Sequence, residues 1–211
     1  MKIIIPARKG SKGLPFKNRK LFDYTVNTIP QELLSNVYVS TDDEMILEKA
    51  AAKNIATIKR KQHLAQDNTS TKDVMADVIK SLSLDPLETI LMLYLTYPER
   101  SWDDVESAIK FFKKNKATSL LCKKDLPISP YLCMIEDGIK GKQLIKHDLY
   151  RRQDYPNCFE ISHFICLFKV LELNNLNNNM YNSNTIFYKI RQVVDVDQPI
   201  DMENFYGKNY S

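Results

Sequence analysis

Short apolar runs rich in β-branched residues recur through roughly the first half of the chain and alternate with segments of helical period. Four of these runs predict β-strands: Lys2–Ile5, Val37–Ser40, Thr89–Tyr94 and Ser119–Cys122. Strands that alternate with helices are typical of a mostly parallel sheet whose faces are covered by helices. The pattern therefore predicts an α/β fold.

Two helices are predicted from apolar residues at helical spacing. The first follows Ser101, where such residues recur at i, i+3, i+4 and i+7: Val105, Ala108, Ile109 and Phe112. The second begins near Thr69 and places three apolar residues on one face: Val74, Val78 and Leu82. Asp73, close to its start, suits the positive end of the helix dipole. The apolar stripe of the first helix is expected to face the core.

Beyond about Asp125 the alternation of strands and helices weakens. Prolines and glycines divide the chain into turns and short hairpin-like pieces up to about Phe168, at Pro127, Pro130, Gly138 and Gly141. We interpret residues 125–168 as an arm inserted into a single domain that spans residues 1–211.

The last part of the chain carries three further predictions. Leu171–Thr185 is rich in asparagine and is expected to be a solvated loop. Val193–Asp197 is predicted to be a strand, and Pro199–Tyr206 a helix.

The composition fits one enzyme-sized globular unit, because 44% of the 211 residues are hydrophobic. A net charge of +4 is modest for this length and does not indicate a nucleic-acid partner or an anionic membrane surface. The opening Met1–Pro6 is too short for a secretory signal, and no later apolar run approaches the length of a membrane span. We therefore expect a cytoplasmic protein. Reduced thiols are favoured over zinc ligands or disulfides in the absence of any C-x-x-C pair among Cys122, Cys133, Cys158 and Cys166.

A cluster of basic residues follows the first predicted strand. It surrounds Gly10, Ser11 and Gly13 and has no acidic residue before Asp23; its members are Arg8, Lys9, Lys12, Lys17, Arg19 and Lys20. A glycine-containing loop directly after the first strand of an open α/β sheet lies at the carboxyl edge, where backbone N–H groups and cations can surround phosphates. The loop has neither Walker A nor G-x-G-x-x-G spacing. It predicts a triphosphate site, and a solvated basic loop is the alternative.

A resemblance to a known family makes this interpretation specific. Ile5–Asn18 closely resembles the nucleotide-binding opening of the acylneuraminate cytidylyltransferases, the CMP-sialic acid synthetase family. Further blocks resemble the family's later motifs, in the family's order: Ser40–Glu44, Arg60 with Leu64, Ala65, Asp67, Ser70 and Thr71, Thr96 with Pro98 and Arg100, Arg151–Asp154, and Asp195–Asp197. Chance does not account for agreement across all of these blocks.

The resemblance implies a Rossmann-like nucleotidyltransferase core with a mostly parallel sheet flanked by helices. It also implies that the arm at about 125–168 is a dimerisation arm, and hence that the protein is a homodimer.

The resemblance further implies that the chain binds CTP, with Arg60 and Thr71 near the cytosine. The residues expected to hold the phosphates and ribose are Ala7, Arg8, Gly10, Ser11, Lys12, Lys17 and Asn18. In the reaction that it implies, the anomeric hydroxyl of an acidic sugar attacks the α-phosphate and pyrophosphate leaves. Catalysis of such a transfer is chiefly positioning and charge neutralisation, which we assign to Arg8, Lys17 and Asp197.

Asp195 and Asp197 are candidate magnesium ligands. Two carboxylates at i and i+2 on a strand point to the same face and can share a hard cation with substrate oxygens. A solvated strand end is the alternative interpretation of such a triplet.

Arg151 and Arg152, with Gln153, are candidate ligands of the sugar. A guanidinium fork suits the carboxylate of an acidic sugar. An exposed pair on the surface of the arm is the alternative.

The chain departs from the family pattern mainly on the sugar side. Tyr94 takes the place of the family's glutamine, Leu95 that of its first proline and Tyr97 that of its serine, while Thr96 is kept. Ser162–Phe164 replaces a late N-G-A pattern, and the G-K-P-L-I segment after the opening motif is missing. We expect Tyr94 and Thr96 to contact the sugar, whose identity is less well specified than the reaction.

The preferred acceptor is a 2-keto-3-deoxy acid sugar, first of all a nine-carbon sialic-like acid. An eight-carbon keto-deoxy acid or another modified sugar is the second choice. A non-catalytic module that binds an anionic partner or a nucleic acid is a third possibility, but the basic loop lacks adjacent stacking aromatics and such a module has no need of the late carboxylate pair.

Overall fold

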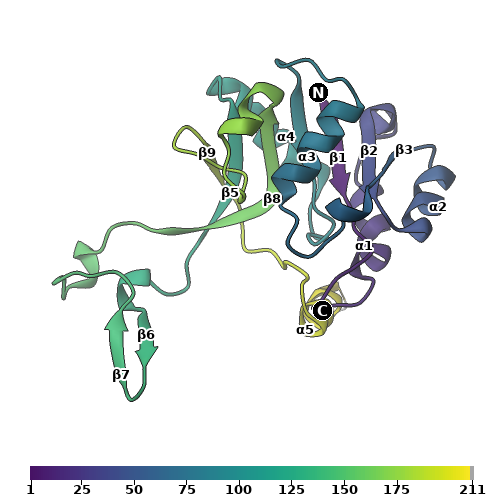
Figure 1. Ribbon diagram of the computed structural model, residues 1–211. Coiled ribbons are helices and arrows are strands. Elements are labelled where there is room, and N and C mark those ends of the chain that lie inside the picture. The colour runs from purple at the N-terminus through teal and green to yellow at the C-terminus, as the bar shows by residue number, and fades with distance from the viewer. Residues whose placement is uncertain (210–211) are drawn as a thin grey trace.

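The computed structural model describes residues 1–209 and shows one seven-stranded sheet with helices on both faces (Figure 1). The strand order is β3-β2-β1-β4-β8-β5-β9. The strands of this sheet are β1 (Lys2–Pro6), β2 (Val37–Thr41), β3 (Ala56–Lys59), β4 (Thr89–Met92), β5 (Ser119–Asp125), β8 (Phe159–Lys169) and β9 (Ile186–Lys189). Strands β1 to β4 run parallel, and β8 is antiparallel to both of its neighbours, β4 and β5. The predicted mostly parallel α/β sheet is confirmed.

Five α-helices connect or flank these strands: α1 (Lys17–Val26), α2 (Glu44–Ala52), α3 (Thr71–Ser81), α4 (Trp102–Lys114) and α5 (Pro199–Asn209). Short 3-10 turns lie at Gln31–Asn36, Gln62–Leu64, Pro130–Leu132, Arg152–Asp154 and Val170–Asn175. Helix α4 begins where the sequence predicts, because Ser101 and Asp104 form a reciprocal capping box. Ser70 caps α3 by accepting a hydrogen bond from the Asp73 N–H.

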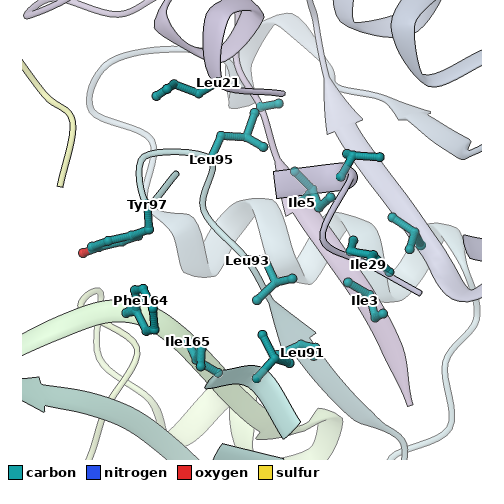
Figure 2. Packing of buried hydrophobic residues seen from close by; sticks show 14 of the residues in the cluster. Ile3, Ile5, Leu21, Ile29, Leu91, Leu93, Leu95, Tyr97, Phe164 and Ile165 are labelled. Carbon is teal, nitrogen blue, oxygen red and sulfur yellow. The ribbon is translucent and has the colours of Figure 1, made fainter. Parts of the chain in front are cut away.

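The core lies on both faces of the sheet, since successive residues of β1 point in opposite directions. Ile3 and Ile5 join a cluster with Leu91 of β4 and Ile165 of β8, as Figure 2 shows, while Ile4 joins a second cluster beneath α3. All three isoleucines are buried. Burial on both faces explains why β1 is a continuous apolar run and not an alternating one.

Two predictions for the last part of the chain are wrong. Val193–Asp197 forms no strand, although Val193 and Val196 are buried. Its backbone instead contacts the segment after β4, where the Val196 N–H donates to the Thr96 carbonyl over 2.8 Å. Leu171–Thr185 is not a solvated loop, because its apolar residues pack on the core: Leu173, Leu176 and Met180. The predicted C-terminal helix is confirmed as α5.

The arm is shorter than predicted. Residues 159–168 belong to β8, which pairs with β4 and β5 inside the central sheet. The projecting segment is therefore residues 126–158, which carry the small hairpin of β6 (Met134–Asp137) and β7 (Lys140–Gln143) and extend away from the sheet (Figure 1). Its surface is apolar to an unusual degree, with exposed side chains at Ile128, Leu132, Met134, Ile135, Ile139, Leu144, Leu149 and Tyr150.

A buried arginine, Arg100, joins three parts of the core. Its guanidinium donates to the Phe164 carbonyl over 2.7 Å and to the Tyr94 carbonyl over 2.8 Å, and it also reaches the Thr25 hydroxyl. Burial lowers the pKa of Arg100 to about 10, which leaves the side chain charged at neutral pH. Arg100 therefore ties the segment after β4 to β8 and to α1.

Replacement of this arginine tests its role in stability. We expect Arg100→Met to lower the free energy of unfolding by about 2 to 5 kcal/mol, because two buried carbonyls lose their donors. Urea denaturation measures the change. Lys110→Met is the control, since Lys110 is exposed on α4 and its removal should change the value by less than about 0.5 kcal/mol. Equal stability of the two variants would contradict this role.

Candidate active site

The predicted nucleotide residues surround a cavity of about 340 Å³. The loop after β1, the segment between β3 and α3, the segment after β4 and residues 195–197 all line it. The predicted site residues that line the cavity are Arg8, Gly10, Ser11, Lys17, Asn18, Arg60, Thr71, Tyr94, Thr96, Asp195 and Asp197. Four segments distant in sequence therefore converge at the carboxyl edge of the parallel strands, where α/β sheets bind ligands.

Backbone contacts fix the loop after β1 at this edge. The Ala7 N–H donates to the Ser40 carbonyl over 2.9 Å, and the Thr41 hydroxyl donates to the Ala7 carbonyl. The buried Asn18 side chain donates to the Arg8 carbonyl over 2.8 Å. Ala7 itself lies beneath the cavity and does not line it. Ala7 and Asn18 thus shape the loop whose cations line the cavity.

The cations of this loop are held by two carboxylates from distant segments. Arg8 and Lys12 pair with the two oxygens of Asp67 at 2.7 and 3.0 Å, and Lys17 pairs with Asp197. Hydrogen bonds from Lys12 and Arg8 lower the pKa of Asp67 below its ordinary value. Lys12 is exposed at the rim, whereas the Lys17 side chain is mostly buried beside the cavity.

Gly13 allows the loop to approach the acidic segment closely. A Cβ atom at this position would collide with the Asp197 carbonyl oxygen, a backbone atom that has no freedom to rotate away. Glycine is therefore required here by close contact, and the contact seats Asp197 against the loop that carries Lys17.

Asp195 and Asp197 line the same cavity without the strand that the sequence predicts. The Tyr97 hydroxyl donates to Asp195 over 2.7 Å. Burial raises the pKa of Asp195, although hydrogen bonds from Thr96 and Tyr97 act in the opposite direction. A nearby cation would stabilise its charged form.

This carboxylate pair fits a magnesium ion. Mg²⁺ is commonly held by one or two carboxylates together with substrate phosphates, and it keeps several water ligands. No group of three or more His, Cys, Asp or Glu side chains suited to a metal occurs within residues 1–209. The pair therefore suits an ion that arrives with a phosphate better than a metal held by protein alone.

The side predicted to face the base contains a buried arginine. Arg60 donates to the Ser40 carbonyl over 2.9 Å, and burial lowers its pKa to about 10. Thr71 lies opposite, at the start of α3, with its hydroxyl 2.6 Å from the Tyr94 hydroxyl. Both residues line the cavity as predicted.

The side predicted to face the sugar is largely aromatic. Tyr94, Tyr97 and His163 line it, whereas Phe164 is fully buried and packs edge to face against Tyr97. Figure 2 shows the Tyr97 hydroxyl turned away from the apolar cluster. Burial raises the pKa of Tyr94 to about 12, so its phenol is neutral at physiological pH. Phe164, one of the departures from the family pattern on this side, does not line the cavity and affects it only by packing against Tyr97.

The arm residues predicted to bind the sugar lie outside this cavity. Arg151 makes a bidentate pair with Asp154 at 2.7 and 3.0 Å, and Arg152 and Gln153 are exposed on the arm. Within the described chain, this fold does not bring Arg151, Arg152 or Gln153 to the cavity that holds Lys17 and Asp197.

Nine further residues line the cavity without having been predicted as site residues: Pro6, Leu64, Gln66, Asp67, Thr69, Val74, Leu95, Tyr97 and His163. Asp67 lies within a motif block, so its position next to basic loop residues is the signal that could have identified it. His163 comes from β8, which the sequence places in the arm. Its signal in the sequence is its place in Ser162–Phe164, where the chain departs from the family's late N-G-A pattern.

None of the helices within residues 1–209 has the length and apolar character needed to cross a membrane.

Comparison with known proteins supports an enzymatic fold. Residues 2–120 match the family described as Cytidylyltransferase. The solved CMP:2-keto-3-deoxy-manno-octonic acid synthetase in complex with CTP superimposes with a TM-score of 0.68 and 16% identity, over 99% of this chain and 98% of that chain. At this identity the likeness establishes the fold alone.

Two curated relatives are similar in sequence. The pseudaminic acid cytidylyltransferase of Campylobacter jejuni is 32% identical over 74% of this chain and 72% of its own length. The N-acylneuraminate cytidylyltransferase of Streptococcus agalactiae is 26% identical over 73% of this chain but only 41% of its own length. The chain thus spans less than half of the streptococcal enzyme. Because the family match covers more than half of this chain and includes the cationic loop, the chain belongs to the cytidylyltransferase family.

Proposed function

We propose that the chain is a CTP-dependent cytidylyltransferase that activates an acidic 2-keto-3-deoxy sugar as its CMP derivative and releases pyrophosphate. One observation carries the proposal: a cationic loop and a carboxylate pair from opposite ends of the sequence meet in one cavity, where Lys17 pairs with Asp197. That arrangement presents positive charge to a triphosphate and acidic oxygens to its metal.

The chemistry requires no covalent enzyme intermediate. The anomeric oxygen bonds to the α-phosphorus as the bond to the pyrophosphate oxygen breaks, and the hydroxyl proton is lost to solvent or a nearby base. Arg8 and Lys17 neutralise charge that develops on the phosphates, and Arg60 and Thr71 face the base. Asp195 and Asp197 would hold Mg²⁺, which when bound supplies further neutralisation of phosphate charge.

The acceptor is inferred from the aromatic side of the cavity. The hydroxyls of Tyr94 and Tyr97 already have protein partners in Thr71 and Asp195, so both residues offer mainly ring surface to a sugar. Ring surface favours deoxy or acyl groups over free hydroxyls. The name of the Campylobacter relative, a pseudaminic acid cytidylyltransferase, supports an acidic sugar as the class of acceptor.

The arm supports a homodimer. Its exposed apolar side chains exceed what a monomer of this size needs, and a second copy of the chain would cover them. Because Arg151, Arg152 and Gln153 cannot serve the cavity of their own chain, we place them at the cavity of the partner copy. There the two guanidinium groups would meet the sugar carboxylate.

Neutralising either carboxylate should abolish transfer without unfolding the protein. We expect Asp195→Asn and Asp197→Asn to lower turnover at least about a hundredfold, on the order of 3 kcal/mol of barrier, because one charged ligand of the metal is lost. Pyrophosphate release measures the effect. Asp103→Asn, an exposed change on α4, is the control and should retain full activity. Near-normal turnover in both site variants would remove the pair from the mechanism.

The acceptor preference can be measured directly. We expect a higher kcat/KM for an acid sugar with fewer free hydroxyls or an added acyl group than for N-acetylneuraminic acid, because mismatched hydroxyls against the aromatic side leave polar groups unpaired at about 1 to 3 kcal/mol each. Steady-state kinetics with CTP in excess gives both constants, and an eight-carbon keto-deoxy acid forms the third arm. A higher constant for N-acetylneuraminic acid would contradict the preference.

Subunit complementation tests the shared site. Arg151→Ala and Asp197→Asn should each inactivate the homodimer. A doubly tagged heterodimer purified after co-expression should recover about half of the wild-type rate, because one of its two symmetric sites then lacks both changes. A monomer at micromolar concentration, or a heterodimer as inactive as both parents, would contradict the arrangement.

A further inference from the structure

Strand β8 contains a large irregularity beside the cavity. Leu120 of β5 pairs with Leu167, but Cys122 pairs with Ser162, so residues 163–166 of β8 lie opposite the single residue Leu121. Bulges of this kind bend a strand and redirect its side chains, and they are over-represented next to active sites. Here the bulge begins with His163, which lines the cavity.

Side chains make hydrogen bonds to backbone groups of this bulge that are not paired with β5. Arg100 donates to the Phe164 carbonyl over 2.7 Å, and the Phe164 N–H donates to the Ser162 hydroxyl over 3.3 Å. The same guanidinium donates to the Tyr94 carbonyl. The Arg100 guanidinium thus holds both the backbone next to His163 and the backbone of Tyr94. The rings of His163 and Tyr94 meet edge to face, with centroids 5.7 Å apart.

A backbone carbonyl selects the tautomer of His163. The Nε2 atom lies 3.0 Å from the Asn179 carbonyl oxygen, which can only accept, so Nε2 carries the hydrogen. In the neutral ring the other nitrogen, Nδ1, is then an acceptor. Asn179 is fixed in turn because Asn177 Oδ1 accepts from the N–H groups of Asn179 and Tyr181 at 2.9 and 3.2 Å. The asparagine-rich segment therefore braces this histidine.

The neighbouring polar groups on this side of the cavity are already engaged. The hydroxyl of Tyr94 meets Thr71, and Asp195 accepts hydrogen bonds from Tyr97 and Thr96. Asn179 does not line the cavity, so the Nε2 edge of His163 serves the protein. Within residues 1–209, no protein group makes a hydrogen bond to Nδ1, which is left as the polar atom that the ring can offer to a ligand.

We propose, building on the function proposed above, that His163 is a specificity residue for the acidic sugar. Its Nδ1 atom accepts a hydrogen bond from a hydroxyl or amide N–H of the acceptor. The rings of Tyr94 and Tyr97 favour apolar groups of the sugar, and His163 favours a sugar that also carries one hydrogen-bond donor at this position. A sugar that lacks this donor leaves Nδ1 unpaired, and sites of this kind discriminate strongly against such analogues.

Two substitutions separate the two ring nitrogens. The amide nitrogen of glutamine can take the place of Nε2 and still donate to Asn179, but it offers no acceptor at the position of Nδ1. The amide oxygen of asparagine can take the place of Nδ1, but the side chain is too short to reach Asn179. His163→Gln should therefore lower kcat/KM for the best acceptor at least about tenfold, and His163→Asn should stay within about threefold of wild type. The KM for CTP should change in neither variant.

Steady-state kinetics of wild type and both variants with one acid sugar decides the matter. Equal acceptor constants in wild type and His163→Gln would overturn this role and leave the proposed function standing. Parallel losses in both variants, or a raised KM for CTP, would assign His163 a purely structural role and overturn the inference as well. If wild type itself turns over no acid sugar while binding CTP, the proposed acceptor class fails, and this inference fails with it.

Discussion

The cations around the loop after β1 repel one another, and the site depends on carboxylates from distant segments that compensate their charge. Arg8, Lys12 and Lys17 lie within ten consecutive residues, and neighbouring like charges are unfavourable without partners. Asp67 takes up Arg8 and Lys12, and Asp197 takes up Lys17. These pairs draw the segment before α3 and the segment before α5 to the end of β1. Residues of both acidic segments line the cavity.

Close packing reinforces this electrostatic arrangement. Gly13 lets the loop touch the backbone of Asp197, and the Val196 N–H completes the junction by bonding to the Thr96 carbonyl. The segment after β4 is itself anchored by Arg100, whose guanidinium also holds the bulge of β8. The phosphate side and the sugar side of the cavity are thus joined through one connected set of buried contacts. The arm, residues 126–158, projects away from the sheet (Figure 1).

Local sequence pattern predicts the parts of this fold that depend on local interactions. Strand β1 is an apolar run between polar residues, and α4 begins at a capping box, so both follow from their own residues. The conformation of Val193–Asp197 does not follow from its own residues. Its β-branched residues are typical of a strand, but Val193 and Val196 are buried in the core and the segment pairs with no strand of the sheet. The sequence places most of β8 in the arm, because the proline and glycine breaks before it hide its start. Its pairing partners, β4 and β5, lie far away in sequence.

The same distinction applies to the site. Charged residues that follow a strand or lie in a family motif, such as Lys17, Arg60 and Asp197, are predictable and do line the cavity. Arg151 lies in an equally clear motif but does not line the cavity, because a local motif does not specify where the fold places it in space. His163 and Asn179 depend on a bulge and on a turn built by asparagine side chains, and no local pattern specifies either.

The proposed function requires that one cavity transfers the cytidylyl group. Incubation of the protein with magnesium, an acid sugar and nucleotide labelled with ³²P at the α or the γ position tests it most directly. We expect acceptor-dependent appearance of α label in a sugar nucleotide and of γ label in pyrophosphate, with CTP and not with ATP, GTP or UTP. Release of γ label as inorganic phosphate, or equal transfer from all four nucleotides, would contradict it.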